Sequence, residues 1–134
     1  MSQQVGILDL TFTAGEDLRS YQYYAVYLSA DNTVSVCTTG HVDPVGILQN
    51  DPNTGEEAVV RPVSCGGTTK VKVGGAVTYG VRCIVATDGM IEAVGALHQT
   101  EQIICGIMLA DAGADGDIAE MLLSHESFVK GTDT

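Results

Sequence analysis

The chain has 134 residues, of which 45% are hydrophobic, and 17 acidic against 6 basic residues give it a formal net charge of −11. This length is most simply one domain with its own core, and the hydrophobic content excludes a chain that is disordered throughout. So acidic a surface repels phosphate backbones, which argues against a nucleic-acid partner, and no segment reaches the roughly 18 apolar residues of a membrane span.

Glycine and the aliphatic residues dominate the pattern. Sixteen glycines, three prolines and no tryptophan favour short strands and tight turns over long helices. The N-terminus lacks the basic region and apolar run of a signal peptide, which predicts synthesis in the cytoplasm. Disulfides are not expected there, so the cysteines are interpreted as small core residues. These are Cys37, Cys65, Cys83 and Cys105.

The N-terminal part of the chain predicts three strands. Residues 1–20 hold one apolar run, interpreted as a first strand or an arm. Residues 24–28 are apolar and aromatic, Asp31 and Asn32 form a turn, and residues 33–37 alternate in hydrophobicity. This pattern predicts a β-hairpin.

The middle of the chain predicts three more strands. Residues 46–48 form a short apolar strand, and a strong turn signal at 50–55 precedes a strand over 58–63. Residues 70–73 then alternate lysine and valine. Since successive side chains of a strand point to opposite faces, the valines share one face and the lysines the other.

The C-terminal part predicts two further pairs of strands. Residues 83–85 and 90–94 flank an Asp-Gly turn, and apolar residues near 103–109 are followed by a turn and a strand over 118–123. Residues 115–128 also admit a helix, since an acid can cap it and apolar residues share one helical face. We favour the strand, because the matching stretch in the first half is strand-like.

The sequence contains an internal repeat. Residues 26–32 match 83–89 at an offset of 57, Gly46-Ile47-Leu48 match Gly106-Ile107-Met108 at 60, and Gly55-Glu56 match Gly116-Asp117 at 61. Two strand-rich units that are each too small to bury both faces can close on one another. We therefore predict a mostly β fold, a compact β-barrel or β-sandwich with internal duplication of a strand-rich unit.

This duplication suggests a domain organisation. One β domain spans residues 21–123 and consists of two related halves, at about 21–63 and 76–123. Residues 1–20 precede it as an arm or first strand, and residues 124–134 follow it as a tail that is frayed or used for contact.

Signals for catalysis or metal binding are weak. The turn at 51–57 has Gly in its fifth position, whereas a calcium loop of the EF-hand type needs Gly in the sixth and helices on both sides. No Cys-x-x-Cys pair occurs, and His41, His98 and His125 are scattered. We therefore expect no metal, no cofactor and no enzymatic activity.

One long stretch carries a family resemblance. Residues 45–80 read VGILQNDPNTGEEAVVRPVSCGGTTKVKVGGAVTYG, and a second Gly-Ile-Met-Leu phrase follows at 106–109. Over residues 45–123 this resembles the small decoration, or cement, proteins of tailed-phage capsids. The segment 79–82 departs from the family, which often has Gly-Asp there.

The resemblance implies a non-enzymatic virion protein that binds the outer surface of the assembled bacteriophage head and stabilises the capsid. Its partners would be the major capsid protein and copies of itself in a homo-oligomer, with a trimer favoured. The alternative is a β-barrel module that binds a small ligand or a carbohydrate. The absence of tryptophan argues against sugar stacking.

Basic residues cluster in the middle of the chain. Four of the six lie within residues 61–82, namely Arg61, Lys70, Lys72 and Arg82. A chain of this charge asymmetry can place its basic part on an acidic partner and its acids in water, so these four are candidate contacts to the capsid or to neighbouring subunits. The alternative is that they balance local acids.

Overall fold

The described part of the chain is built from strands. The computed structural model describes residues 8–38, 43–86, 88–94 and 101–129, and no helix occurs in these ranges. It follows that none of the described residues form a helix able to cross a membrane. The helix alternative for residues 115–128 is wrong, because Ile118–Val129 form a single long strand.

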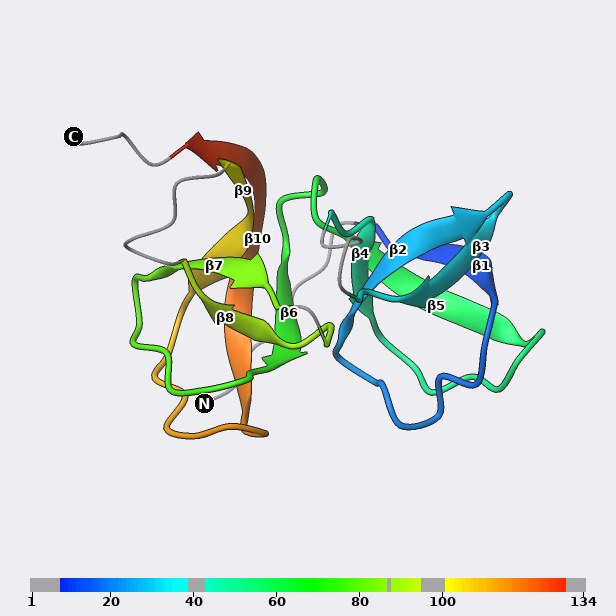
Figure 1. Cartoon of the computed structure of the whole chain (residues 1–134), viewed down its shortest axis with the longest axis horizontal. Helices are drawn as coiled ribbons and strands as arrows, with labels where there is room; N and C mark the ends of the chain where they lie inside the picture. Colours follow the sequence, from blue (N-terminus) through cyan, green and yellow to red (C-terminus); the bar gives the residue numbers. More distant parts are fainter. Residues whose placement is uncertain (1–7, 39–42, 87, 95–100, 130–134) are drawn as a thin grey trace.

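Ten strands fall into two groups that lie side by side, with β6 at the centre of the molecule (Figure 1). The first half of the molecule carries β1 (Leu10–Ala14), β2 (Ala25–Ala30), β3 (Thr33–Val36), β4 (Gly46–Leu48) and β5 (Glu57–Pro62). The second half carries β6 (Thr68–Lys72), β7 (Arg82–Val85), β8 (Ile91–Ala93), β9 (Glu101–Met108) and β10 (Ile118–Val129).

The first half is a closed barrel with the strand order β1-β3-β2-β4-β5. β1 runs parallel to β3 and antiparallel to β5, and the remaining neighbours pair antiparallel. The alternation seen in the sequence places Val34 and Val36 inside, together with Val26, Leu48 and Val60. Closure leaves no open sheet edge in this half.

The second half repeats the same pairing. β10 lies between β6 and β9, and β7 lies between β9 and β8. A parallel bridge between Val73 and Ile91 then joins the end of β6 to β8, as β1 joins β3 in the first half. Each strand therefore has the same neighbours as the strand five places earlier, which confirms a mostly β fold with an internally duplicated unit.

The duplication extends to the turns. The N–H of Gly55 donates to the carbonyl of Ala14 at 2.8 Å, and the N–H of Gly116 donates to the carbonyl of Val73 at 2.7 Å. Both glycines adopt positive φ angles, 82° and 90°, in the left-handed region that favours glycine. The repeated Gly-acid phrase thus marks the same turn in each half.

The repeated Gly-Ile phrase has a steric cause. A Cβ on Gly46 would lie 2.4 Å from the carbonyl oxygen of Arg61, and one on Gly106 would lie 2.5 Å from that of Leu122. Each glycine sits where the neighbouring strand's backbone passes too close for any side chain. The same close approach occurs at the same place in both halves.

The strands of each unit extend outside the predicted halves. β1 lies within residues 1–20 and β6 lies before residue 76, yet each pairs with strands of its own half. β10 continues through Val129 into the predicted tail. Residues 1–7 and 130–134 lie outside the described residues, and the boundaries proposed from the sequence stay a prediction.

The two barrels differ in how they close. In the first half, the N–H of Thr13 donates to the carbonyl of Asn32 at 2.8 Å, which links β1 directly to the turn before β3. The residues at the matching places of the second half are Lys72 and Gly89. No such direct bond joins them, because the first half occupies the gap.

The segment Tyr23–Ala25 fills this gap. The N–H of Lys72 donates to the carbonyl of Tyr23 at 3.1 Å, and the N–H of Ala25 donates to the carbonyl of Gly89 at 2.9 Å. The chain entering β2 therefore bridges the two edges of the second sheet. The N–H of Lys72 and the carbonyl of Gly89, which the missing direct bond would leave unpaired, both have hydrogen-bond partners in this segment.

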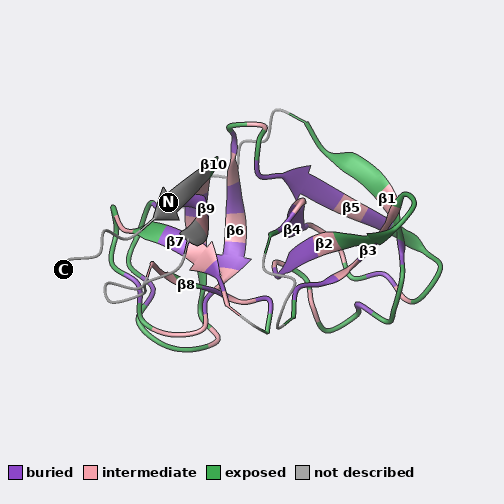
Figure 2. Cartoon of the chain, turned by 45° about the horizontal axis from the view of Figure 1, so that its top comes forward, coloured by how far each residue is buried: buried purple, intermediate pink, exposed green. Residues whose placement is uncertain are grey.

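A shared core also joins the halves. Ala25, Cys37, Ile47 and Val63 of the first half point away from their own barrel and are buried with the interior of the second. Figure 2 shows the buried positions of β4, β5 and β6 on both sides of the junction. Burial of an Ile or Val side chain contributes about 1.5–3 kcal/mol, so this junction stabilises the contact between the two halves.

Candidate functional site

Two of the predicted contact residues lie on β6 at the centre of the molecule. Val71 is buried between Lys70 and Lys72, so the two lysines project together from the opposite face. Glu120 lies directly across from Lys70 on β10, and Ile118 lies across from Lys72. The strand pattern predicted for this segment is confirmed, and it sets both lysines on the outer surface of the second sheet.

Arg61 belongs to an internal ion pair. Its side chain is 10% exposed, and its Nε and Nη2 atoms lie 2.8 and 3.1 Å from the carboxylate of Asp9. Its Nη1 donates to the carbonyl of Thr68 at 2.9 Å. A buried guanidinium needs these partners, and it ties β5 to the start of β6.

Arg82 lies apart from the other three bases. It is exposed at the start of β7, and β10 and β9 separate that strand from β6. The structure therefore brings Lys70, Lys72 and Arg61 together along β6 and leaves Arg82 on a second surface. Their role in binding a capsid or a neighbouring subunit stays a prediction.

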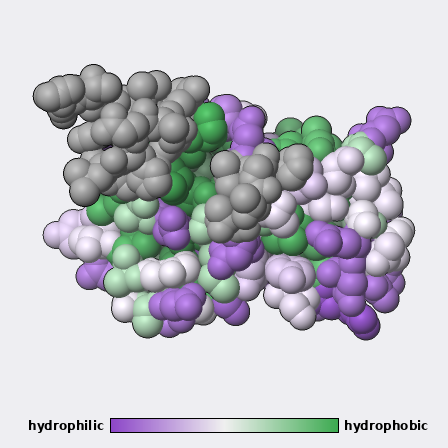
Figure 3. All heavy atoms as spheres, in the orientation of Figure 1, coloured by the Kyte–Doolittle hydropathy of each residue, from purple (hydrophilic) through white to green (hydrophobic). Residues whose placement is uncertain are grey.

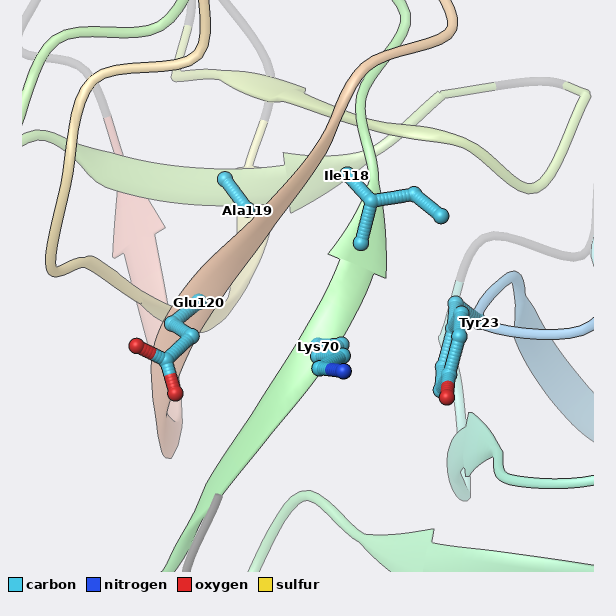
Figure 4. A pocket seen from close by; sticks show the side chains of 5 residues that line it. All are labelled: Tyr23, Lys70, Ile118, Ala119 and Glu120. Carbon is cyan, nitrogen blue, oxygen red and sulfur yellow. The ribbon is translucent and has the colours of Figure 1, made fainter. Parts of the chain in front are cut away.

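A notch of about 360 Å³ opens between the two halves of the molecule, beside Lys70 of β6 (Figure 4). The side chains that line it are Tyr23, Lys70, Ile118, Ala119 and Glu120. Oε2 of Glu120 is buried and has no hydrogen-bond partner in the described structure. A small-molecule site uses several converging polar groups in an enclosed apolar pocket, and this notch offers few of them.

Tyr23 has an unusual backbone at the edge of the notch. Its φ is 72°, and Gly80, which holds the matching position in the second half, has a φ of 82°. Both residues donate an N–H to a strand of their own half, Tyr23 to the carbonyl of Leu48 in β4 and Gly80 to that of Met108 in β9. The left-handed region costs a tyrosine on the order of 1 kcal/mol, and the bond from Lys72 to the Tyr23 carbonyl holds it there.

Several large apolar side chains are exposed among the described residues. They are Leu8 (52%), Leu10 (38%), Leu28 (53%), Tyr79 (67%), Leu109 (47%) and Ile118 (52%). Leu8 and Leu10 lie at the start of β1. Tyr79 and Leu109 lie near each other, because the N–H of Gly80 donates to the carbonyl of Met108 at 2.7 Å. Sequence reasoning missed these surfaces, since exposure of one apolar residue depends on what the rest of the chain covers.

Hydrophilic side chains gather at the outer end of the first half, on the right of Figure 3. In the loop after β1, the guanidinium and N–H of Arg19 donate to Asp17 and lower the pKa of that carboxyl to about 2. In the second half, Asp117 accepts the N–H groups of Gly113 and Ala114, each at 3.1 Å. The acidic turns are thus held by bonds to their own backbone.

The described residues contain no group of three or more His, Cys, Asp and Glu side chains placed to hold a metal ion. His41 and His98, weighed as ligands, lie outside the described residues. His125 lies 3.5 Å from Asp43 at the surface.

Burial governs the chemistry of three thiols. It raises the pKa of Cys37 to about 12 and that of Cys83 to about 11, and it also raises the pKa of Cys105. All three belong to the shared core, and Cys65 is half-buried against it. Because the thiolate is the reactive form, the three buried thiols are inert. Their interpretation as core residues is confirmed.

The fold defines an all-β protein of two duplicated five-strand units. No protein-family model matches the sequence, and no curated protein matches it. Among solved structures, the chain is similar to the head fiber gp8.5 N base of bacteriophage phi29. The two share 15% sequence identity with a TM-score of 0.64, over 87% of this chain and 93% of that chain.

Proposed function

We propose that this chain is a structural protein of a phage head, and that it decorates the outer surface of the assembled capsid and stabilises it. The observation that carries the proposal is the likeness of the whole two-barrel fold to a head fiber base, over most of both chains. The resemblance of residues 45–123 to the decoration proteins supports it independently, because that resemblance lies in the sequence.

The physical properties of the molecule suit this role. The two halves share a core, which lets the protein contact a shell through both of them. We propose a non-enzymatic function, as the resemblance to decoration proteins and the likeness to a head fiber base support. The acidic outer end of the first half suits a surface that faces water and does not aggregate.

The proposed partners are the major capsid protein and further copies of the chain, with a trimer favoured. Many modest contacts on a symmetric lattice sum to stable attachment. We propose that Lys70 and Lys72 contribute to the capsid contact, since they project together from β6 beside the notch. Arg61 is the weakest of the four candidates, because Asp9 and Thr68 already engage its guanidinium.

A cosedimentation experiment tests the proposal. Purified protein is mixed with heads that lack it, and bound copies are counted after sedimentation at several salt concentrations. We expect saturable binding, and we expect Lys70→Gln with Lys72→Gln to weaken it about tenfold. Arg19→Gln is the matched control, because Arg19 is an exposed base of the first half that lies outside β6 and does not line the notch. Absence of saturable binding by the unaltered protein would overturn the proposed function.

A further inference from the structure

The junction between the two halves is a contact between two different faces of the same repeated unit. The first half contributes its outer face, where Ala25 and Ile47 pair across β2 and β4 and are fully buried. The second half contributes the β6 side of its barrel. Nε2 of Gln49 donates to Oγ1 of Thr69 at 2.8 Å across this contact.

The second half has the same outer face, but none of the described residues covers it as the second half covers that of the first. Arg82 and Ile107 pair across β7 and β9, as Ala25 and Ile47 do in the first half. The N–H of Val94 donates to the carbonyl of Arg82 at 2.9 Å, and the matching bond in the first half runs from Cys37 to Ala25 at 3.0 Å. Where those first-half residues are buried, Arg82 is exposed and Ile107 and Val94 are partly exposed.

Leu109 completes this uncovered face. Its N–H donates to the carbonyl of Glu120 at 2.9 Å, and the N–H of Gln49 donates to the carbonyl of Val59 at 2.7 Å in the same way. Leu109 therefore stands where the first half has Gln49, the residue that crosses the junction. We name the set Tyr79, Arg82, Val94, Ile107 and Leu109 the second outer face.

The first half, in turn, has an uncovered β1 side. Leu10 lies across from Val60 in β5, as Thr69 lies across from Met121 in β10. Thr69 is fully buried under Gln49, whereas Leu10 is 38% exposed and Leu8 beside it is 52% exposed. We name Leu8 and Leu10 the β1 face.

We infer that the second outer face of one copy binds the β1 face of another copy, so that the same two sides of the repeated unit meet between chains as within each chain. The first barrel is closed between β1 and β3, so the incoming face packs against its outside and inserts no segment. Within the chain, the polar residues Gln49 and Thr69 meet across the contact. In the contact between copies, Leu109 takes the place of Gln49 and Leu10 takes the place of Thr69, and both leucines are exposed. Each copy therefore carries two complementary faces, each with exposed leucine at its centre.

Charge agrees with this pairing. The second outer face carries Arg82, whereas the side of the first half that would meet it carries Glu57 next to Thr13 in the sheet. Glu57 occupies the place that Ile118, beside Tyr23, holds in the internal junction. Glu57 thus stands on the side of the first half that would face Arg82.

The contact is heterologous, because it joins two different faces, and repeated use of it builds either a closed ring or an open filament. A ring is the form that agrees with the symmetric homo-oligomer of the proposed function, on which the biological meaning of this inference rests. The interface itself depends only on the geometry of the duplicated unit.

Sedimentation of the free protein tests the interface. The variants place in each half the residue that the other half carries: Leu109→Gln, after Gln49, and Leu10→Thr, after Thr69. We expect an oligomer at micromolar concentration for the unaltered protein and at least about tenfold weaker association for each variant. Leu28→Gln is the matched control, since Leu28 is 53% exposed outside both faces. A monomer at all concentrations, or an oligomer that both variants leave unchanged, would overturn the inference.

Cross-linking covers the case in which a variant folds poorly. Two proteins are made in a Cys65→Ser background, one with Leu10→Cys and the other with Leu109→Cys, and are mixed under a mild oxidant. We expect disulfide-linked dimers of unlike chains in the mixture that exceed those in either protein alone. Gln49→Cys with Thr69→Cys in one chain is the positive control, because these side chains touch within the chain. No excess of mixed dimers, when the control pair links, contradicts the inference.

Head binding separates this inference from the proposed function. A protein that stays monomeric and still saturates heads overturns the interface alone. A protein that associates through Leu10 and Leu109 but never binds heads overturns the head-decoration role alone.

Discussion

The two halves of this molecule agree in their interiors and differ on their surfaces. Both have the same strand neighbours, the same positive-φ turns and the same close approach at Gly46 and Gly106. Their outer faces diverge, with Ala25 and Ile47 covered in the first half and Arg82 and Ile107 at the surface in the second. The two units share the strand pairing, turns and glycines that the fold requires. Their surface residues differ, because each unit has different neighbours.

Tyr23 and Gly80 hold matching positions with the same left-handed backbone conformation, but they differ in residue type and neighbours. Gly80 meets the left-handed conformation without cost, and nothing lies within 4 Å of where its Cβ would be. Tyr23 adopts the same conformation at the junction, where its carbonyl accepts from Lys72. The contact between halves therefore sustains a strained residue that the second half avoids.

The largest effect is expected at the glycines of the Gly-Ile phrase. Gly46→Ala and Gly106→Ala each drive a methyl group into a neighbouring carbonyl, so each should lower the free energy of unfolding by about 3 kcal/mol or more. Gly55→Ala is the control, with open space but a φ of 82°, and should cost about 1 kcal/mol. Urea denaturation measures all three. Equal small losses would show that strand spacing does not constrain these positions.

The next effect distinguishes a covered from an uncovered outer face. Ile47→Ala should lower the free energy of unfolding by about 3 kcal/mol, because Ile47 is fully buried in the shared core. Ile107→Ala, at the matching but partly exposed position, should cost about 1 kcal/mol when the chain is monomeric. Equal costs in dilute protein would contradict the asymmetry of the junction.

Much of the fold was accessible from sequence, and the reasons are local. The Lys-Val alternation of β6 and the Gly-acid turns depend on residues close together in the chain, and both predictions are confirmed. The sequence-based boundaries left β1 and β6, the first strands of the two units, outside the predicted halves, because the sequences of these two strands do not resemble each other. β1 reads Leu-Thr-Phe-Thr-Ala and β6 reads Thr-Thr-Lys-Val-Lys.

The candidate site was less accessible, because long-range partners decide it. Arg61 looked like a surface base, but Asp9, 52 residues away, engages its guanidinium. The insertion of Tyr23 between the edges of the second sheet depends on a contact between halves that no local pattern records. Leu10 and Leu109 are ordinary strand residues in sequence, and only the matching of the two halves gives them meaning.

A smaller effect is expected at high pH. Burial raises the pKa of Cys37 to about 12 and of Cys83 to about 11 from an ordinary value of 9.0. Above pH 9 the unfolded chain therefore loses thiol protons that the folded chain retains, so stability should fall as pH rises from about 9 through 12. Denaturation of the double variant Cys37→Ala, Cys83→Ala should show a shallower fall. An unchanged slope would show that these thiols do not contribute.

The same burial predicts which thiol reacts at neutral pH. A thiol reagent should modify Cys65, which is half-buried, and leave Cys37, Cys83 and Cys105 unmodified until the chain unfolds. Mass spectrometry of the labelled native protein identifies the site. Rapid labelling of Cys105 in folded protein would contradict the shared core.

The smallest effect concerns Asp17. Its bonds from Arg19 lower its pKa to about 2, so its carboxylate should stay ionised in mildly acidic solution, with little change in stability because the pair is exposed. The side-chain NMR titration of Asp17 checks this, with Arg19→Gln as the comparison. A midpoint near 3.8, the ordinary value, would show that the pair does not persist in solution.

Electron cryomicroscopy of heads incubated with the purified protein tests the central claim most directly. The account predicts regularly spaced density on the outer surface, into which the two-barrel body fits with adjacent copies touching through the β1 face and the second outer face. Heads whose outer surface is identical with and without the protein, at saturating concentration, would contradict it.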